Sequence, residues 1–154
     1  MVRILMVCMG NICRSPMAEG IMRDFINTYN LDAEVDSAGT INFHQGEMPD
    51  MRAVNKSLQH EINIRNLKAR PFVDKDFRLF DKIFVMDLEN LNDIIYRAKK
   101  DVDKEKVSLI MSELYKNEVV EVPDPYYGGD QDFENVFQML YKACEAIAKK
   151  IDKK

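Results

Sequence analysis

The chain has few residues of several types, and these shortages narrow the classes of protein that it can belong to. It contains no tryptophan, three cysteines and two histidines among 154 residues. A small, odd number of cysteines points to free thiols in a reducing compartment, so we expect a cytoplasmic protein. Cys8 and Cys13 have the wrong spacing for a zinc knuckle, and no histidine is near them in the sequence. We therefore expect no metal and no other cofactor.

Long apolar runs and an excess of positive charge are also missing. The apolar run near the N-terminus is only a few residues long and ends at Gly10-Asn11, which predicts neither a signal peptide nor a membrane-spanning segment. The net charge of −4 gives no general attraction to nucleic acid or to anionic membranes, so any anion site must be local. The composition, 46% hydrophobic and 31% charged, is that of a soluble globular protein. Without repeats or linkers, residues 1–154 are expected to form a single domain.

Apolar patterns along the chain alternate between strands and helices. Strands are predicted at residues 2–7, 33–38, 80–86 and 107–110. Helices are predicted from Pro16 to about Tyr29, after Asp50 with an apolar face of Ala53, Val54 and Leu58, after Asp87, and near the C-terminus. Residues 99–106 are expected to form a charged surface turn, and 61–71 fit no element. This order predicts an α/β fold, a three-layer domain with a four-stranded parallel sheet flanked by helices on both faces, and a site at the carboxyl ends of the strands.

The most informative stretch runs from Val7 to Pro16 and reads Val-Cys-Met-Gly-Asn-Ile-Cys-Arg-Ser-Pro. It joins a predicted strand to a predicted helix, where unpaired N–H groups and the positive end of the helix attract anions. This field and Arg14 favour the thiolate of Cys8, and the planar guanidinium of Arg14 fits two oxygens of a phosphate. The five residues between them are enough to wrap the backbone around a tetrahedral oxyanion. Gly10 permits tight curvature, and Asn11 tolerates a positive φ.

Attack of a thiolate on a phosphate ester also needs a proton donor for the leaving oxygen. The candidate is Asp124 in the segment Val-Pro-Asp-Pro-Tyr-Tyr-Gly-Gly, which follows the fourth strand and so lies on the same edge as Cys8. Pro125 pushes Asp124 toward an extended backbone that aims its carboxyl group into the site. The walls of a cleft for an aromatic ring are expected from Ile12, Phe43, Tyr126 and Tyr127.

These motifs, together with Asp36-Ser37-Ala38-Gly39 and Val85-Met86-Asp87, resemble those of the low-molecular-weight protein tyrosine phosphatases over nearly all 154 residues. The resemblance implies hydrolysis of phosphotyrosine proteins or peptides, with inorganic phosphate as the product and a cysteinyl-phosphate intermediate. Cys8 matches the nucleophile, Arg14 the phosphate-binding arginine and Asp124 the general acid. The need for a deprotonated Cys8 and a protonated Asp124 predicts a bell-shaped, mildly acidic pH optimum. We expect a monomer or a weak dimer.

The resemblance also assigns supporting roles. The loop that binds phosphate comprises Met9, Gly10, Asn11, Ile12, Cys13 and Ser15, and Ser15 matches the hydroxyl that stabilises the thiolate. Asn11 and Ser37 match residues whose hydrogen bonds hold the shape of this loop. Cys13 matches a second thiol that in relatives forms a reversible disulfide with the nucleophile, and Tyr126 and Tyr127 resemble sites that kinases phosphorylate in some relatives.

The chain departs from the family pattern at two places. Leu67 stands where the family often has a histidine that supports the loop, so Asn11 and Ser15 must be supported from elsewhere, and His60 is no evident substitute. Phe43 and His44 occupy the variable loop that tunes substrate choice, which leaves the preferred phosphopeptide open.

Three alternatives to tyrosine phosphatase activity remain. Protein arginine phosphatases share this loop and fold, but typically have threonine at the position of Ile12, and the larger apolar group favours a phenyl ring. Arsenate reductases of the same fold need further cysteines, for which Cys144, a predicted core residue, is a poor candidate. A phosphate-binding module without catalysis would not need Cys8, Arg14 and Asp124 together.

Overall fold

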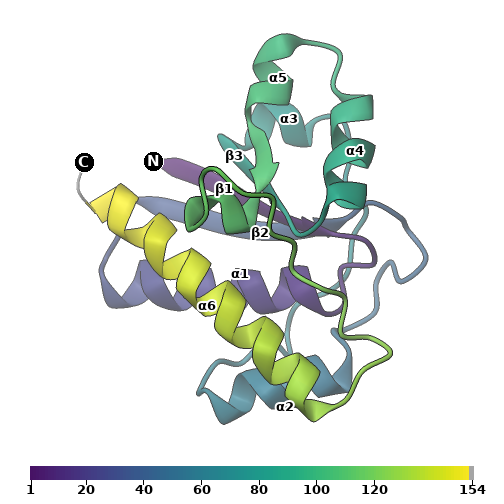
Figure 1. Cartoon of the computed structure of the whole chain (residues 1–154), viewed down its shortest axis with the longest axis vertical. Helices are drawn as coiled ribbons and strands as arrows, with labels where there is room; N and C mark the ends of the chain where they lie inside the picture. Colours follow the sequence, from purple (N-terminus) through teal and green to yellow (C-terminus); the bar gives the residue numbers. More distant parts are fainter. Residues whose placement is uncertain (153–154) are drawn as a thin grey trace.

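A four-stranded sheet lies between two layers of helices in the computed structural model, which describes residues 1–152 (Figure 1). The strands are all parallel and lie in the order β2-β1-β3-β4. Their bounds are β1 (Val2–Cys8), β2 (Ala33–Gly39), β3 (Lys82–Val85) and β4 (Val107–Leu109). The predicted α/β fold with a four-stranded parallel sheet is therefore confirmed.

The central strand β1 explains the two hydrophobic cores of the molecule. Its residues Ile4, Leu5, Met6 and Val7 are fully buried, as expected for a parallel strand covered on both faces. Because side chains alternate along a strand, Ile4 and Met6 join one core and Leu5 and Val7 join the other. The alternation thus gives each face of the sheet apolar side chains against which helices pack.

The helices divide between the two faces (Figure 1). On one face lie α1 (Arg14–Thr28), α2 (Met51–Gln59), α6 (Asp130–Asp152) and the short 3-10 helix η1 (Ile110–Glu113). On the other face lie α3 (Asp76–Leu79), α4 (Leu88–Arg97) and α5 (Asp101–Glu105). Within residues 1–152, none of these helices combines the length and apolar composition needed to cross a membrane.

Several predicted boundaries were wrong. The first helix begins at Arg14 and not at Pro16, because the loop before it closes early and Met17 already donates a backbone hydrogen bond to Cys13. The third strand is shorter than residues 80–86, since only Lys82–Val85 finds partners on β1 and β4. Ile110 leaves the fourth strand and begins η1.

Two short helices were missed, and one apolar face was misassigned. Residues 101–105 form α5 inside the predicted charged turn, and α3 was not predicted at all. Neither has the length needed for an apolar period to show in the sequence. The predicted face of α2 includes Leu58, but this side chain is exposed, whereas Lys56 and Ser57 are buried.

An ionic cluster between α2 and α6 explains why Lys56, and not the predicted Leu58, lies on the buried face of α2. The Lys56 ammonium lies 3.0 Å from a carboxylate oxygen of Asp130 and 3.3 Å from one of Glu134, and its side chain is only 4% exposed. The Nε2 atom of His60 lies 3.0 Å from Glu134, and the His60 ring stacks on Phe137 with 4.1 Å between centroids. The cluster ties α2 to α6, and His60 takes part in it.

Replacement of Glu134 by glutamine tests the contribution of this cluster to stability. Hydrogen bonds from Gln138, His60 and Lys56 lower the pKa of Glu134 from its ordinary 4.5 to about 2. A depressed carboxyl pKa stabilises the folded state fully above pH 4.5, and this stabilisation is lost as the pH falls toward 2. We expect Glu134→Gln to lower the free energy of unfolding by about 1 kcal/mol at pH 7. The difference from the wild type should shrink below pH 4.5 in urea titrations.

The matched control is Glu145→Gln on the same helix, since Glu145 has no ion-pair partner among residues 1–152. This control should leave stability nearly unchanged at both pH values. A Glu134→Gln difference that persists unchanged at pH 2.5 would show that the ionised carboxylate is not the source of the stabilisation.

Candidate active site

The carboxyl ends of β1 and its neighbours open into a cavity of about 280 Å³. Its walls come from three segments that are distant in sequence: the Cys8–Ser15 loop, the loop after β2 and the loop before α6. Ile41 is the one lining residue that was not predicted, and the predicted Asn11, Ser15 and Ser37 lie outside the lining. The cavity is lined by Cys8, Met9, Gly10, Ile12, Cys13, Arg14, Ile41, Phe43, His44, Asp124, Tyr126 and Tyr127.

Two close approaches set the shape of the Cys8–Ser15 loop. The positive φ in this loop, 57°, belongs to Asn11, as predicted, and not to Gly10. A Cβ atom at Gly10 would lie 3.1 Å from Cδ2 of His44, so this glycine lets the variable loop approach. A Cβ atom at Gly39 would lie 2.7 Å from the carbonyl oxygen of Met9, a distance that no side chain tolerates. The sequence motif contains Gly39, but its role as a spacer was not predicted.

A chain of side-chain hydrogen bonds runs beneath the loop. The amide nitrogen of Asn11 donates to Oγ of Ser15 at 2.7 Å and to Oγ of Ser37 at 3.0 Å. The backbone N–H of Arg70 donates to the side-chain oxygen of Asn11 at 3.0 Å. Oγ of Ser15 lies 3.0 Å from Sγ of Cys8, and because it accepts from Asn11 its own proton is free to point at the sulfur. The network thus places a hydroxyl group within hydrogen-bond distance of the Cys8 sulfur.

Glu19 is the last member of this series of hydrogen bonds. It supports the Cys8–Ser15 loop from below, in the absence of the histidine that many relatives have at the position of Leu67. Ser37 donates its hydroxyl proton to Oε1 of Glu19 at 2.6 Å, and Arg23 forms an ion pair with the other carboxylate oxygen. Glu19 is buried, and burial raises its pKa against the opposing effects of Ser37 and Arg23. Leu67 packs against the core and takes no part. One signal for Glu19 is present in the sequence: a carboxylate stands one turn after Ser15 on the first helix.

Protein contacts hold the Arg14 guanidinium through Nη1, which leaves its other side free to face the cavity. Its Nη1 donates to Asp87 at 2.7 Å and to the carbonyl oxygen of Val122 at 2.9 Å, and its side chain is 4% exposed. The Nη2 atom lies 3.9 Å from Oδ2 of Asp124. Burial alone would lower the pKa of Arg14, but Cys8, Asp87 and Asp124 outweigh it and raise that pKa. Arg14 is therefore a permanent cation in the site.

Asp87 was predicted only as a helix cap, and the structure gives it a second contact. One carboxylate oxygen accepts from the backbone N–H of Asn90 at the start of α4, and the other accepts from Arg14. Its position just after β3 was the available signal, because parallel strands deliver their carboxyl ends to the same edge.

Asp124 faces the cavity from a turn of its own loop. Its Oδ1 accepts the backbone N–H of Tyr126 at 3.1 Å, and 41% of its side chain is exposed, so Oδ2 remains available to a ligand. Tyr126 packs edge-on against Tyr127 with 5.0 Å between ring centroids. Tyr127 is 96% exposed and Phe43 is 78% exposed, so these rings stand at the rim and not on the floor.

The three cysteines are all free and buried. Burial, followed by the charges of Asp50, Cys8 and Asp124, raises the pKa of Cys13 far above its ordinary value, so Cys13 is a neutral thiol. Cys144 lies in the core between α6 and α1 as predicted, where its thiol contacts the carbonyl oxygen of Ala18. The pairing of Cys13 with Cys8 stays a prediction.

The fold and the site together define a class: α/β proteins whose strand-to-helix loop presents a cysteine and a buried arginine to an anion-sized cavity. The family follows from comparison with known proteins. Residues 3–154 match the family model described as low molecular weight phosphotyrosine protein phosphatase. The chain belongs to this family of hydrolases.

Individual relatives are similar to this chain in sequence and in structure over nearly its whole length. The low molecular weight phosphotyrosine protein phosphatase of Rattus norvegicus is 37% identical over 150 residues, covering 96% of this chain and 94% of the relative. The crystal structure of a protein tyrosine phosphatase from Entamoeba histolytica superposes with a TM-score of 0.92 at 35% identity, covering 99% of this chain and 98% of the other. The drosophila arginine phosphatase has a TM-score of 0.86 at 32% identity and covers 96% of both chains.

Replacement of Ser37 by alanine tests the network beneath the loop. The change removes one acceptor of Asn11 and leaves the buried Glu19 carboxylate without its hydroxyl donor. We expect orthophosphate to bind about tenfold more weakly, because the loop is no longer fixed in one shape. The dissociation constant from an NMR titration is the measurement.

Ser57→Ala is the matched control, because the Ser57 hydroxyl is buried and has no hydrogen-bond partner among the described residues. This variant should bind orthophosphate as the wild type does. Equal affinities of Ser37→Ala and the wild type would mean that Asn11 and Ser15 are held without Ser37.

Proposed function

We propose that this protein hydrolyses phosphotyrosine in proteins or peptides through a cysteinyl-phosphate intermediate. The observation that carries the proposal is the convergence of Cys8, Arg14 and Asp124 on one cavity of about 280 Å³. A nucleophile, a fixed cation and a carboxyl group that line one cavity are the three groups that phosphoryl transfer without a metal requires.

In the first step, the Cys8 thiolate attacks phosphorus and the bond to the phenolic oxygen breaks. Asp124, protonated, donates its proton to that oxygen, so tyrosine leaves as a neutral phenol. The phosphoryl oxygens are held by the free side of the Arg14 guanidinium and by the N–H groups of the Cys8–Ser15 loop. The proposal draws support from the contacts of Arg14 with Asp87 and Val122, which fix the guanidinium before substrate arrives.

In the second step, water attacks the phosphocysteine and the sulfur leaves. Asp124, now ionised, takes a proton from the water, and orthophosphate is released. Ser15 donates a hydrogen bond to the departing sulfur, which is consistent with the 3.0 Å separation of the two atoms. Asn11 donates to the Ser15 oxygen, which leaves the hydroxyl proton of Ser15 available for the sulfur.

The walls of the cavity favour an aromatic substrate. Tyr126, Tyr127 and Phe43 rise at its rim, and Ile12 lies among its lining residues. A phenyl ring between such walls would gain stacking and apolar contact. The Arg52 guanidinium lies 5.3 Å from the Tyr126 ring centroid, which restricts the motion of that wall.

Arginine phosphatase activity is the second candidate, because the drosophila arginine phosphatase shares this fold. The phosphorylated guanidine group of phosphoarginine, joined through a P–N bond, is polar and planar, and it would leave its N–H groups without partners against an aliphatic side chain. Ile12 lines the cavity and packs against the core, so its apolar group cannot turn away. Phosphotyrosine is therefore the favoured substrate.

Two substitutions test the chemical roles. Cys8→Ser should lower turnover of aryl phosphates by at least about 10⁴-fold while orthophosphate still binds, because a hydroxyl is a far weaker nucleophile. Asp124→Ala should lower kcat about 10²-fold or more on phenyl phosphate and far less on 4-nitrophenyl phosphate, whose phenolate leaves without a proton. Steady-state kinetics on both esters give the comparison.

Two controls accompany these variants. Cys144→Ala removes a buried thiol far from the cavity, and Asp132→Asn alters a carboxylate on α6 that bonds only to its own turn in the described residues. Both should retain turnover. Near-normal activity of Cys8→Ser would refute the nucleophile assignment, and failure to trap any phosphocysteine in acid-quenched wild type would favour a binding module.

Replacement of Ile12 by threonine tests the choice between tyrosine and arginine. We expect Ile12→Thr to raise the ratio of kcat/KM for phosphoarginine to that for phosphotyrosine peptides about tenfold, since it adds a hydroxyl and removes apolar volume. Ile12→Val is the matched control, because it shortens the side chain without a hydroxyl. A wild type that hydrolyses phosphoarginine faster than phosphotyrosine would overturn the proposed substrate class.

A further inference from the structure

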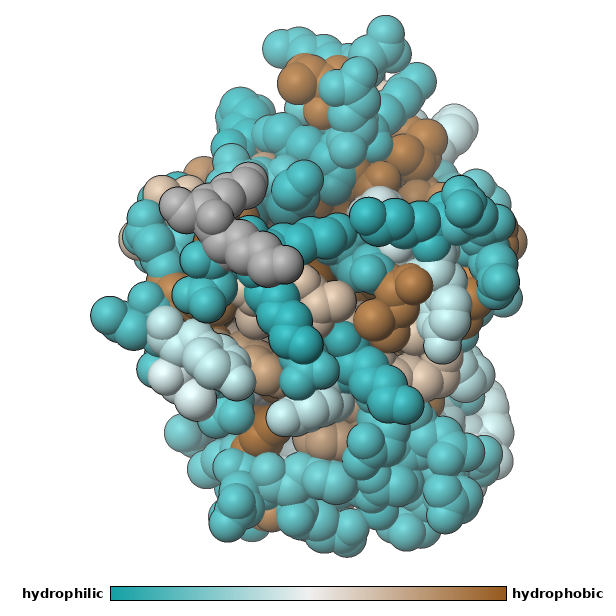
Figure 2. All heavy atoms as spheres, turned by 60° about the vertical axis from the view of Figure 1, so that its left-hand side comes forward, coloured by the Kyte–Doolittle hydropathy of each residue, from teal (hydrophilic) through white to brown (hydrophobic). Residues whose placement is uncertain are grey.

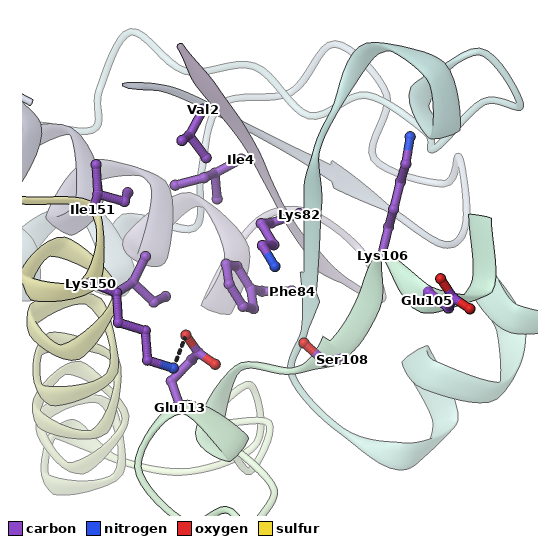
Figure 3. Close-up of a pocket in the computed structure, with 11 residues that line it drawn as sticks. Val2, Ile4, Lys82, Phe84, Glu105, Lys106, Ser108, Glu113, Lys150 and Ile151 are labelled. Atoms are coloured by element: carbon purple, nitrogen blue, oxygen red, sulfur yellow. Dashed lines mark hydrogen bonds and ion pairs between the residues drawn. The ribbon is translucent and has the colours of Figure 1, made fainter. Parts of the chain in front are cut away.

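A second cavity, of about 390 Å³, lies at the amino ends of the strands, on the edge of the sheet opposite Cys8 (Figure 3). Strands β1, β3 and β4 form its floor, and η1 and the last turns of α6 form its walls. The side of the molecule with both chain termini is mostly hydrophilic, with hydrophobic residues in small groups (Figure 2). The cavity is lined by Val2, Ile4, Lys82, Phe84, Glu105, Lys106, Ser108, Glu113, Ile147, Lys150 and Ile151.

The strand register explains why this part of the sheet is hollow. Ile4 pairs with Lys82 and Phe84 pairs with Ser108, so these side chains share the face that α1 and α6 cover. Parallel strands covered on both faces usually carry apolar residues at such positions. A lysine and a serine stand there instead, at the margin of the region that the last turns of α6 cover. The result is an apolar floor with a cation at its edge.

Among the charged residues that line the cavity, Lys82, Lys106 and Glu105 have no oppositely charged partner within residues 1–152. Nζ of Lys150 pairs with Glu113 at 3.1 Å and spans the gap between α6 and η1. Lys106 donates to the carbonyl oxygen of Phe77 and is directed away from Lys150 in Figure 3. Lys82 has neither an ion pair nor a side-chain hydrogen bond among residues 1–152, and it extends toward Phe84 (Figure 3). With three lysines and two glutamates, the lining carries one net positive charge.

We propose that this cavity binds a small monocarboxylate with an apolar body. The carboxylate would pair with Lys82, and the apolar body would lie on Ile4 and Phe84 beneath Ile147 and Ile151. A single unpaired lysine matches one negative charge better than the two of a phosphate monoester. This site is separate from Cys8 and does not depend on the proposed phosphatase activity.

Octanoate, free and below its micellar concentration, is the probe. An NMR titration of the whole protein with saturating orthophosphate keeps the Cys8–Ser15 loop occupied, so any carboxylate that prefers that loop is displaced. We expect octanoate to shift amide signals of β3, β4 and residues 147–151, and acetate and octylamine to leave them unchanged. Lys82→Gln should weaken octanoate binding about fivefold, as expected for one partly exposed ion pair.

Two further variants separate binding in this cavity from nonspecific binding to surface lysines. Lys99→Gln removes an exposed lysine outside the cavity and should bind octanoate as the wild type does. Ser108→Leu places a larger apolar side chain on the floor and should abolish binding while the protein stays folded in the same spectra. Equal binding of octylamine, unchanged affinity in Lys82→Gln, shifts confined to the Cys8–Ser15 loop, or shifts only above the micellar concentration would each overturn the proposal.

Discussion

The pairing of Arg14 with Asp87 is the contact on which the arrangement of the site depends. Arg14 is almost completely buried at the first position of α1, and a buried guanidinium needs an anionic partner. Asp87 supplies it from the end of β3, and the carbonyl oxygen of Val122 takes the second bond. Because Val122 lies two residues before Asp124, the same guanidinium also positions the segment that carries the proposed acid. The Arg14 guanidinium thus connects the Cys8–Ser15 loop, the end of β3 and the segment that carries Asp124.

The Cys8–Ser15 loop is held from below by a chain of neutral and acidic groups without a histidine. Asn11 is saturated: both of its N–H groups donate to serines, and its oxygen accepts from the backbone of Arg70. The chain ends at Glu19, whose burial raises its pKa against the opposing contacts with Ser37 and Arg23. A carboxylate at this end accepts from Ser37, so the Ser37 oxygen accepts from Asn11. Asn11 also donates to Ser15, which leaves the Ser15 proton free to point at the Cys8 sulfur.

The sequence predicted the parts of the molecule whose signal is local. The apolar run of β1 and the spacing of Cys8 and Arg14 were readable because they lie within one segment. Gly39 and Asp87 were not assigned their contacts, since the loop that Gly39 touches and the arginine that Asp87 pairs with are set by the packing of separate strands. Leu58 was misassigned for the same reason: an ion cluster with α6 turned Lys56 inward, and no pattern within α2 shows it.

The cavity at the amino ends of the strands and the site at their carboxyl ends are joined by the same strands. Strands β1 and β3 run from the floor of the second cavity to Cys8 and to Val85, two residues before Asp87, so the two sites share a scaffold. A shared scaffold transmits a signal only where it has two arrangements of similar energy. Here the connecting residues are fully buried and closely packed on both faces, which leaves little room for a second arrangement. A ligand at the far end would therefore stabilise the fold by mass action and leave phosphatase turnover unchanged.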